Sequence, residues 1–463
     1  MTALSETKKY QAYPEYKDSG VEWLEEVPSD WDVIKIKHLS PVKRGASPRP
    51  IDDPKYFDEE GEYAWVRIAD VSASKTYLET TTQIMSELGS SLSVKLEPNQ
   101  LFLSIAGTVG KPCINKIKAC IHDGFVYFPD LKIPNKYLFY VFAGEQAYKG
   151  LGKMGTQLNL NTDTVGDIKV TLPREHGHIE QIVHFLDHET AKIDTLIEKQ
   201  QQLIKLLKEK RQAVISHAVT KGLNPQAPMK DSGVEWLGEV PEHWDVSRLK
   251  FECDVVDCRN KTPEYFENGE YFVVRTTNVK KQKLNFNGAL YTDKKNFDIW
   301  TQRGIPPSGS ILFTREAPTG EVCLVPDNLK FCMGQRMMNF ISNSQAYTNY
   351  LFDYLISDCL DRYINSVSHG STVSHLRVEQ VENIPVPVPP QKELIAIHEH
   401  ILNLKTQYDD LESNALKAID LMKERRTALI SAAVTGKIDV RNWQAPGVQH
   451  AASVHEPPLE AMA

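Results

Sequence analysis

The chain of 463 residues is an internal duplication, and this feature limits its possible folds more than any other. Residues 17–33 (KDSGVEWLEEVPSDWDV) and residues 230–246 (KDSGVEWLGEVPEHWDV) are identical at fourteen of seventeen positions. A second match, between residues 208–220 and residues 423–435, lies near the end of each half. Its offset is nearly the same as that of the first match. This period is far longer than the repeat of a solenoid. The sequence therefore predicts two copies of one large unit, related by a pseudo-two-fold axis like the subunits of a homodimer.

Each copy divides into a mixed module and a long helix. Residues 34–170 and 247–386 contain short β-rich runs separated by the turn-forming residues Gly, Pro, Asn and Ser, which is typical of strands joined by turns. Each module ends in a Pro-bounded segment, IKVTLP (168–173) or IPVPVPP (384–390), which favours an edge strand or an extended linker over a helix. A heptad pattern of apolar residues follows in both copies and continues for six heptads.

The heptad pattern predicts a coiled-coil seam, because two apolar positions recur every seven residues without an interrupting Gly or Pro. The first position begins at Ile179 in copy one and at Leu394 in copy two, and the second lies three residues further on. Two amphipathic helices that each pack on their own module are the alternative. The predicted seam residues are Ile179, Leu186, Ile193, Leu196, Leu203, Leu207, Leu394, Ile401, Leu404, Tyr408, Leu411 and Met422.

These patterns divide the chain into six regions. They are residues 1–16, an N-terminal tail; 17–173, the first module; 174–222, the first long helix; 223–390, the second module with a linker at 223–229; 391–438, the second long helix; and 439–463, a Pro/Ala/His-rich tail that we expect to be disordered.

Composition points to a cytoplasmic protein. No apolar run is long enough for a membrane span, and residues 1–16 lack the apolar core of a signal peptide. Seven scattered cysteines favour a reducing compartment over a disulfide framework. The formal charge of −8 lies outside the modules, since residues 34–165 carry 16 Lys/Arg against 14 Asp/Glu and residues 247–381 carry 16 against 15.

Catalytic motifs are absent from the sequence. A literal G-x-G-x-x-G occurs at Gly150, Gly152 and Gly155, but no buried strand is expected before it and no helix after it, as a dinucleotide or S-adenosylmethionine loop requires. No phosphate-binding P-loop, nuclease carboxylate cluster or zinc quartet appears. His184 and His188 share a helical face, where solvated surface histidines are the more common interpretation. We therefore expect no catalytic residue and no metal site in this chain.

Loops with cationic and amide side chains are candidates for DNA contact. Arg can bind guanine, and Asn or Gln can bind adenine, in the major groove. Equivalent loops of the two copies carry different residues, as expected if one scaffold reads two sequences; solvated surface loops are the alternative for any one of them. The candidates are Arg44, Arg49, Thr108, Lys111, Gln157, Asn159, Asn161, Arg259, Lys261, Arg315, Thr319, Ser371, Thr372 and His375.

The whole arrangement resembles the specificity subunit of type I restriction–modification enzymes. The resemblance rests on SGVEWLxEVPxxWDV at the start of each half, the GTVGK turn at 107–111, IKVTLPREHGHIEQIVHFLD at 168–187 and the K-E-[KR]-R helix ends, and it covers roughly residues 13–440. Copy two departs from it with FTREAPTG at 313–320 and with IPVPVPPQKELIAI, which places individual contact residues in question.

The resemblance implies an α+β fold with two pseudo-symmetric target-recognition domains separated by a long antiparallel two-helix coiled coil. It also implies a non-catalytic subunit that reads a bipartite, asymmetric site in double-stranded DNA. Two methyltransferase subunits would dock on the coiled coil and would carry the restriction subunits. S-adenosylmethionine, ATP and Mg²⁺ would be bound by those partners, with no membrane involved. The alternative is a coiled-coil scaffold or tandem DNA-binding protein that acts outside restriction.

Overall fold

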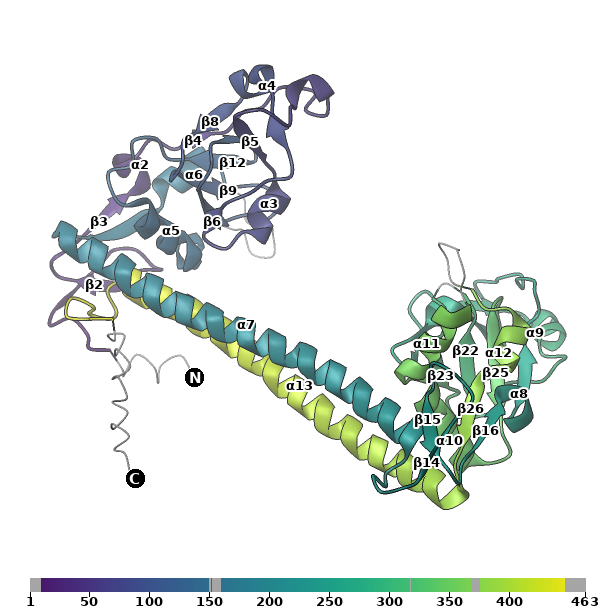
Figure 1. The fold of residues 1–463 in the computed structure, drawn as a ribbon. Coiled ribbons are helices and arrows are strands. Elements are labelled where there is room, and N and C mark those ends of the chain that lie inside the picture. Colours follow the sequence, from purple (N-terminus) through teal and green to yellow (C-terminus); the bar gives the residue numbers. More distant parts are fainter. Residues whose placement is uncertain (1–9, 150, 152–159, 317, 368–374, 446–463) are drawn as a thin grey trace, which may run out of the picture. The chain divides into compact units, whose positions relative to one another are not determined.

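The computed structural model describes residues 10–149, 151, 160–316, 318–367 and 375–445 (Figure 1). The chain forms two compact units: unit 1 contains Met1–Gln200 and Lys417–Ala463, and unit 2 contains Gln201–Leu416. The divisions fall within the two long helices, α7 (His176–Lys221) and α13 (Gln391–Val434), and not at the expected boundaries between module and helix. Each unit therefore combines one module with segments of both helices.

The module of unit 1 is built around two sheets. One has the order β4-β12-β9-β10-β6 and the other β7-β5-β11-β8; β10–β6 and β11–β5 are parallel pairs, and the remaining pairs are antiparallel. The strands are β4 (Lys43–Arg44), β5 (Tyr63–Val66), β6 (Tyr77–Leu78), β7 (Ile84–Met85), β8 (Val94–Leu96), β9 (Leu101–Ser104), β10 (Pro112–Asn115), β11 (Ala119–Ile121) and β12 (Phe125–Tyr127). The helices are α2 (Ile36–Leu39), η2 (Pro54–Tyr56), α3 (Ile68–Ala73), α4 (Glu87–Ser91), α5 (Asn135–Ala143), η3 (Gln146–Tyr148) and α6 (Thr162–Asp167).

The module of unit 2 repeats this topology with different residues. Its sheets have the orders β17-β25-β22-β23 and β21-β18-β24, which correspond to β4-β12-β9-β10 and β7-β5-β11. The strands are β17 (Asp254–Asp257), β18 (Tyr271–Val274), β19 (Val279–Lys280), β20 (Lys283–Leu284), β21 (Leu290–Thr292), β22 (Ile311–Thr314), β23 (Val322–Leu324), β24 (Phe331–Met333) and β25 (Met337–Ile341). The helices are α8 (Leu249–Glu252), η4 (Thr276–Asn278), α9 (Lys294–Trp300), α10 (Gln345–Leu355), α11 (Asp358–Val367) and α12 (Val378–Glu382).

Two-stranded antiparallel sheets connect each module to a long helix. The Pro-bounded segments are strands: β13 (Lys169–Pro173) pairs with β3 (Trp31–Lys35), and β26 (Pro385–Val388) pairs with β16 (Asp245–Arg248). The hairpins at the start of each copy are β1 (Tyr16–Asp18) with β2 (Glu26–Pro28), and β14 (Met229–Asp231) with β15 (Glu239–Pro241). The duplication seen in the sequence therefore extends to strand pairing.

The two long helices run antiparallel, and charged side chains mark their register. In unit 2 the Lys208 ammonium lies 3.0 Å from a Glu412 oxygen, and Arg211 donates to Asp409 at 2.5 Å. In unit 1, Arg426 donates to both oxygens of Asp194, at 2.9 and 3.3 Å. The residue number rises along one helix as it falls along the other, and all three pairs fit one register.

Two of these ion pairs are copies of each other. Asp194 and Asp409 are separated by 215 residues, as are Arg211 and Arg426, which is the offset of the closing sequence match. The Asp194–Arg426 pair in unit 1 therefore corresponds to the Arg211–Asp409 pair in unit 2. Each pair joins one helix from each copy, as a pseudo-two-fold arrangement requires.

Nine of the twelve predicted seam residues are buried or half-buried, and three are exposed. All eight predicted residues of the first seam position are buried or half-buried, and Leu404 of the second position is half-buried. The eight are Ile179, Leu186, Ile193, Leu207, Leu394, Ile401, Tyr408 and Met422. Along the middle of α7, however, the second seam position follows the first by four residues and not by three, at Ile197 and Ile204. Leu196, Leu203 and Leu411 are 40%, 43% and 50% exposed.

The error in α7 arises because the residues three and four positions after the first seam position are both apolar. Ile197 and Ile204 directly follow the two exposed leucines in α7 and take the half-buried seam positions. A heptad pattern with Leu-Ile pairs fits either spacing, so the sequence could not distinguish the two stripes. Contact with the partner helix selects the stripe at the four-residue spacing.

The chain ends also differ from the expectation. Tyr13, Ile438 and Val440 are buried in the core of unit 1, so the expected N-terminal tail (1–16) and disordered tail (439–463) both contain packed residues. The Asp439 amide donates to the Gln11 carbonyl at 2.7 Å, and Trp443 packs edge-on against Phe185 at 5.3 Å. Apolar residues after the end of α13 complete this core, while residues 1–9 and 446–463 lie outside the described residues.

The corrected seam predicts that replacing two adjacent residues, Ile197 and Leu196, has different effects on stability. We expect Ile197→Ala to lower the free energy of unfolding by about 1–2 kcal/mol, because it removes half-buried apolar contact. Leu196→Ala, which removes an exposed side chain, should change it by less than about 0.5 kcal/mol. Urea denaturation of both variants measures the difference. An equal loss for both variants would contradict the register described here.

Candidate nucleic-acid interface

Three loops meet at the same place on the scaffold of each module, and a fourth joins them in unit 2. The three are the segment after β4 or β17, the turn after β9 or β22, and the turn before β12 or β25; the fourth is the segment before α12. In unit 1, backbone bonds join the Ile105 amide to the Gly124 carbonyl at 2.8 Å. In unit 2, the equivalent bond joins the Arg315 amide to the Arg336 carbonyl at 2.9 Å, and Leu376 donates to the Arg315 carbonyl at 3.0 Å. Residues far apart in the sequence are thereby held together.

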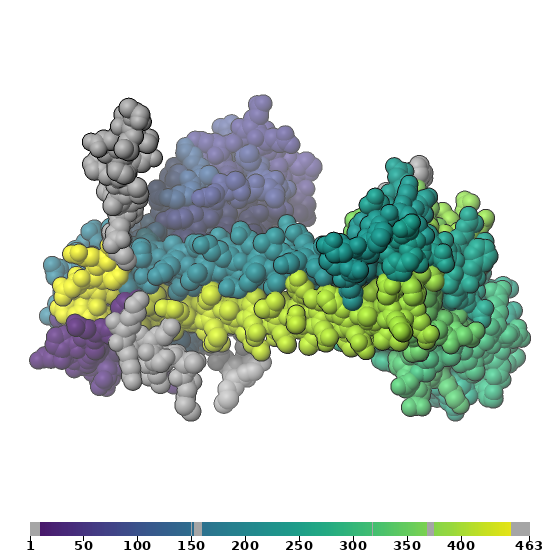
Figure 2. All heavy atoms as spheres, turned by 60° about the horizontal axis from the view of Figure 1, so that its bottom comes forward, coloured from purple at the N-terminus to yellow at the C-terminus, as the bar shows by residue number. Residues whose placement is uncertain are grey.

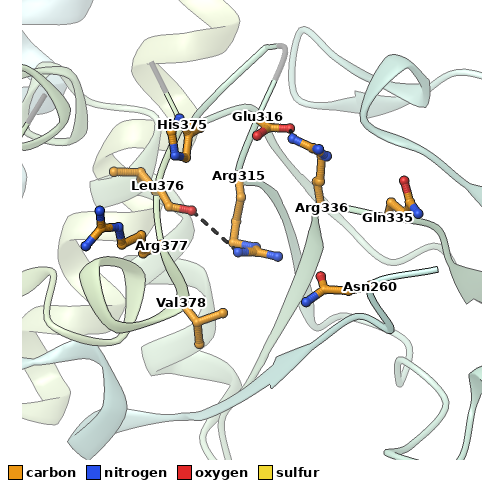
Figure 3. Close-up of a pocket in the computed structure, with 9 residues that line it drawn as sticks. All are labelled: Asn260, Arg315, Glu316, Gln335, Arg336, His375, Leu376, Arg377 and Val378. Carbon is orange, nitrogen blue, oxygen red and sulfur yellow. Dashed lines mark hydrogen bonds and ion pairs between the residues drawn. The ribbon is translucent and has the colours of Figure 1, made fainter. Parts of the chain in front are cut away.

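In unit 2 these loops enclose a polar pocket of about 340 Å³ (Figure 3). Its floor is the Arg315 side chain, which is only 12% exposed. One Arg315 Nη lies 3.2 Å from an Asp257 carboxylate oxygen, and the other donates to the Leu376 carbonyl at 3.5 Å. The pocket is lined by Asn260, Arg315, Glu316, Gln335, Arg336, His375, Leu376, Arg377 and Val378.

Glu316 and Arg336 form the rim of this pocket. Figure 3 shows their side chains pointing toward each other, and they form an ion pair. Half of the Arg336 side chain is exposed, whereas Glu316 is mostly covered. With three arginines and one glutamate, the lining has a positive balance, and its amides and His375 add hydrogen-bonding groups. Such a pocket suits a polar ligand rich in acceptors.

The sequence candidates in unit 2 lie in or beside this pocket. Arg315 and His375 line it, and the Thr319 hydroxyl donates to the Arg315 carbonyl at 3.3 Å within the turn. Arg259 and Lys261 flank Asn260, which lines the pocket. Ser371 and Thr372 lie outside the described residues.

The loop of Arg259 and Lys261 is held by α9. Arg259 donates to the Ile299 carbonyl at 3.3 Å, and its guanidinium lies 5.2 Å from the Trp300 ring centroid. The Trp300 indole donates to the Lys261 carbonyl at 2.9 Å. Both cationic side chains are exposed, so they project from an anchored loop.

In unit 1 the segment after β4 and the turn before β12 line a larger cleft of about 1650 Å³, together with Trp65, Arg67 and residues 81–84. Asp123, in the turn before β12, lies 2.9 Å from Arg49 and accepts from Arg44 through its carbonyl at 2.6 Å. His122 lies beside the Trp65 ring at 5.6 Å, and burial lowers the pKa of His122, which favours a neutral ring near pH 7. The predicted cations Arg44 and Arg49 therefore converge on one carboxylate at the cleft.

Three other predicted residues of unit 1 stabilise local structure. The Thr108 hydroxyl lies 2.6 Å from the Ser72 hydroxyl, and the Lys111 ammonium donates to the Ser72 carbonyl at 2.7 Å, which joins the turn after β9 to α3. The Asn161 side chain caps α6 by accepting from the amides of residues 163 and 164, each at 2.9 Å. Gln157 and Asn159 lie outside the described residues.

Sequence reasoning missed the residues that organise both sites. Asp257, Glu316 and Arg336 in unit 2, and His122 and Asp123 in unit 1, were not among the candidates. The turns at 122–124 and 334–336 share no identical residue at equivalent positions, and only strand topology shows that they correspond. The signal that could have indicated them is the alignment of equivalent strands in the two copies, which places both turns directly before the same strand.

The structure also bears on catalytic and metal sites. Across the described residues, no group of three or more His, Cys, Asp or Glu side chains could hold a metal ion. Each of the seven cysteines is a buried free thiol, and burial raises the pKa of Cys253 to about 12. His188 lies 3.1 Å from Glu189, and His184 is exposed. The short helix η3 precedes Gly150, where a dinucleotide loop would need a strand; Gly150, Gly152 and Gly155 themselves lie outside the described residues.

None of the helices in the described part of the chain combines the length and apolar character that a bilayer crossing needs.

Comparison with known proteins identifies the family. The model of the type I restriction modification DNA specificity domain matches twice, at residues 28–206 and 241–421. The putative type I restriction enzyme MjaX specificity subunit of Methanocaldococcus jannaschii is 24% identical over 453 residues, covering 92% of this chain and 98% of the relative. The EcoDI specificity subunit of Escherichia coli is 21% identical, covering 90% and 91%.

A solved structure shares the fold. A chain from a study of complex assembly and conformational transition in the type I restriction–modification system superposes with a TM-score of 0.63 at 14% identity, covering 89% of this chain and 99% of that one. The two family matches correspond to the two copies of the duplication and together span most of the sequence. The chain therefore belongs to the family of type I restriction–modification DNA specificity domains.

Proposed function

We propose that this chain is the DNA-recognition subunit of a type I restriction–modification complex and that each module reads one half of a bipartite, asymmetric target. The observation that carries the proposal is the equivalence of the loop sites in the two modules. The equivalent loops, with the end of β4, present Arg44, Arg49 and Asp123 in unit 1 but Glu316 and Arg336 in unit 2. One scaffold with two sets of side chains suits a target whose two halves differ.

The charge of the modules supports a model in which this chain and its partner subunits bind DNA together. Each module is close to neutral, so its net charge gives it little attraction for the phosphate backbone. Base-edge contacts can specify a sequence without large net charge, whereas phosphate contacts supply most of the non-specific affinity. We infer that partner subunits supply much of the phosphate contact while this chain selects the site.

The long helices offer a docking surface for two methyltransferase subunits. Five leucines on the helix segments of unit 2 are exposed, and burial of exposed apolar side chains against a partner protein is favourable. They are Leu203, Leu206, Leu402, Leu411 and Leu416. Figure 2 shows side chains of both long helices at the molecular surface. Restriction subunits would join through the methyltransferase, and the complex would act on DNA in the cytoplasm.

A gel-shift assay with the purified chain, with and without its methyltransferase subunit, tests this function. We expect a specific shift of duplexes that carry the host's methylated motif, strengthened by the methyltransferase. Sequencing of methylated positions in the host genome supplies the motif. Equal binding of cognate and random duplexes would contradict a specificity role, and no binding of either would point to a scaffold.

We expect the chain to contribute no catalysis of its own. S-adenosylmethionine, ATP and Mg²⁺ would be bound by the partner subunits, because the sequence contains no motif suited to them. The purified chain should therefore neither bind S-adenosylmethionine nor methylate DNA. Isothermal titration calorimetry checks this prediction, and the chain with its methyltransferase subunit is the positive control. Stoichiometric cofactor binding by the chain alone would contradict it.

The anchored loop beside the unit 2 pocket gives a further prediction. Replacing Arg259 and Lys261 together by Ala should weaken binding to the cognate second half-site. Loss of a base-edge contact would cost about 1–3 kcal/mol and relax specificity there, whereas loss of a phosphate contact would weaken all sequences alike. Competition gel shifts with cognate and random duplexes separate these cases. Unchanged affinity for both would exclude this loop from the interface.

A further inference from the structure

The arginines of the unit 2 pocket differ in what they can reach, and this difference assigns them separate roles. Both Nη atoms of Arg315 are engaged, by Asp257 and by the Leu376 carbonyl, and the side chain is almost fully covered. Arg315 therefore forms a rigid floor. Arg336 lies at the rim with half of its side chain exposed, where a ligand can approach it.

The backbone holds Arg336 in an unusual conformation. Its φ of +67° lies in the left-handed region, which non-glycine residues seldom adopt. The Arg336 amide donates to the Cys258 sulfur at 3.0 Å, and its carbonyl accepts from the Arg315 amide at 2.9 Å. Non-glycine residues held in this region are concentrated at ligand-binding sites, where the surrounding structure offsets the strain.

Only one copy of the duplication has an arginine here. The bond between the Arg315 amide and the Arg336 carbonyl matches the bond between the Ile105 amide and the Gly124 carbonyl in unit 1. Gly124 therefore occupies the equivalent position and has no side chain with which to read a base. A residue that differs in this way can distinguish the two half-sites.

Glu316 orients the Arg336 guanidinium. The Glu316 carboxylate contacts the Arg336 guanidinium, and half of the Arg336 side chain stays exposed. A guanidinium has five N–H donors, so pairing with one carboxylate leaves a fork of two parallel donors for a second ligand. Because the side chain is already positioned, binding costs less conformational entropy.

Two ligands in DNA accept such a fork, guanine through O6 and N7 and the phosphate group. The neighbouring Glu316 carboxylate would repel a phosphate, whereas the edge of a guanine base carries no net charge. We propose that Arg336 reads a guanine in the half-site bound by the second module and that Glu316 is its positioning residue. This inference rests on the proposed DNA-recognition function.

The test uses the full chain together with its methyltransferase subunit and duplexes that carry the methylated motif. In these duplexes, each guanine is replaced in turn by 7-deazaguanine, which lacks the N7 acceptor. Arg336→Ala should weaken cognate binding by roughly 5–150-fold, the range of a bidentate base contact. At one guanine of one half-site, 7-deazaguanine should weaken the wild type but have little further effect on Arg336→Ala.

Arg362→Ala is the matched control. Arg362 lies on α11 of the same unit, is 55% exposed and pairs with Asp358 at 2.6 Å, but does not line the pocket. Its replacement removes the same charge and should leave recognition at every guanine unchanged. Arg336→Lys should retain binding to random DNA and lose discrimination, because an ammonium keeps the charge without the planar fork.

Glu316→Gln tests whether Glu316 acts by orienting the Arg336 side chain or only through its negative charge. Removing a negative charge beside DNA should leave random-sequence binding equal or stronger, while discrimination at that guanine falls. If Arg336→Ala weakens cognate and random duplexes alike and reduces the salt dependence, Arg336 contacts phosphate and the inference is wrong. If the wild type shows no sequence preference, the proposed function fails instead.

Discussion

Antiparallel pairing of α7 with α13 is the contact on which the rest of the structure depends. Each unit contains segments of both helices, so neither core is completed by one copy of the duplication alone. In unit 1, Ile179 and Ile182 of α7 share the core with Ile430 and Val434 of α13. In unit 2, residues from the end of α7 and the start of α13 have the corresponding role. Each module therefore packs on the start of one helix and the end of the other.

The duplicated Asp–Arg pairs explain how this pairing is specified. An apolar seam alone tolerates sliding by a heptad, because the same pattern recurs every seven residues. Asp194 with Arg426, and Asp409 with Arg211, meet in one register, and a shift would separate both pairs. Since the side chains in the unit 1 pair are only 22% and 27% exposed, separation would also leave partly buried charges without partners. These pairs therefore contribute more to register than to overall stability.

The modules combine a common scaffold with different loops. The strands that both modules share have the same order, and an equivalent backbone bond holds the loops at equivalent positions. The side chains there are free to change, because they face a cleft or a pocket and contribute little to the core. In unit 1 two arginines meet the carboxylate of Asp123, whereas in unit 2 Arg336 meets Glu316. A duplicated recognition domain can acquire a second specificity in this way without a new fold.

The sequence by itself determined the duplication, the module–helix order, the two long helices and one of the two seam positions, because each depends on local periodicity or on matches between the copies. It also indicated the loops that contain Arg259, Arg315 and His375. Only the tertiary structure decided that Ile197 faces the partner helix in place of Leu196, since both are apolar and the partner selects between them. Similarly, only the fold brings Val440 into the first core and Arg336 beside Glu316, because such contacts depend on strand pairing between distant segments.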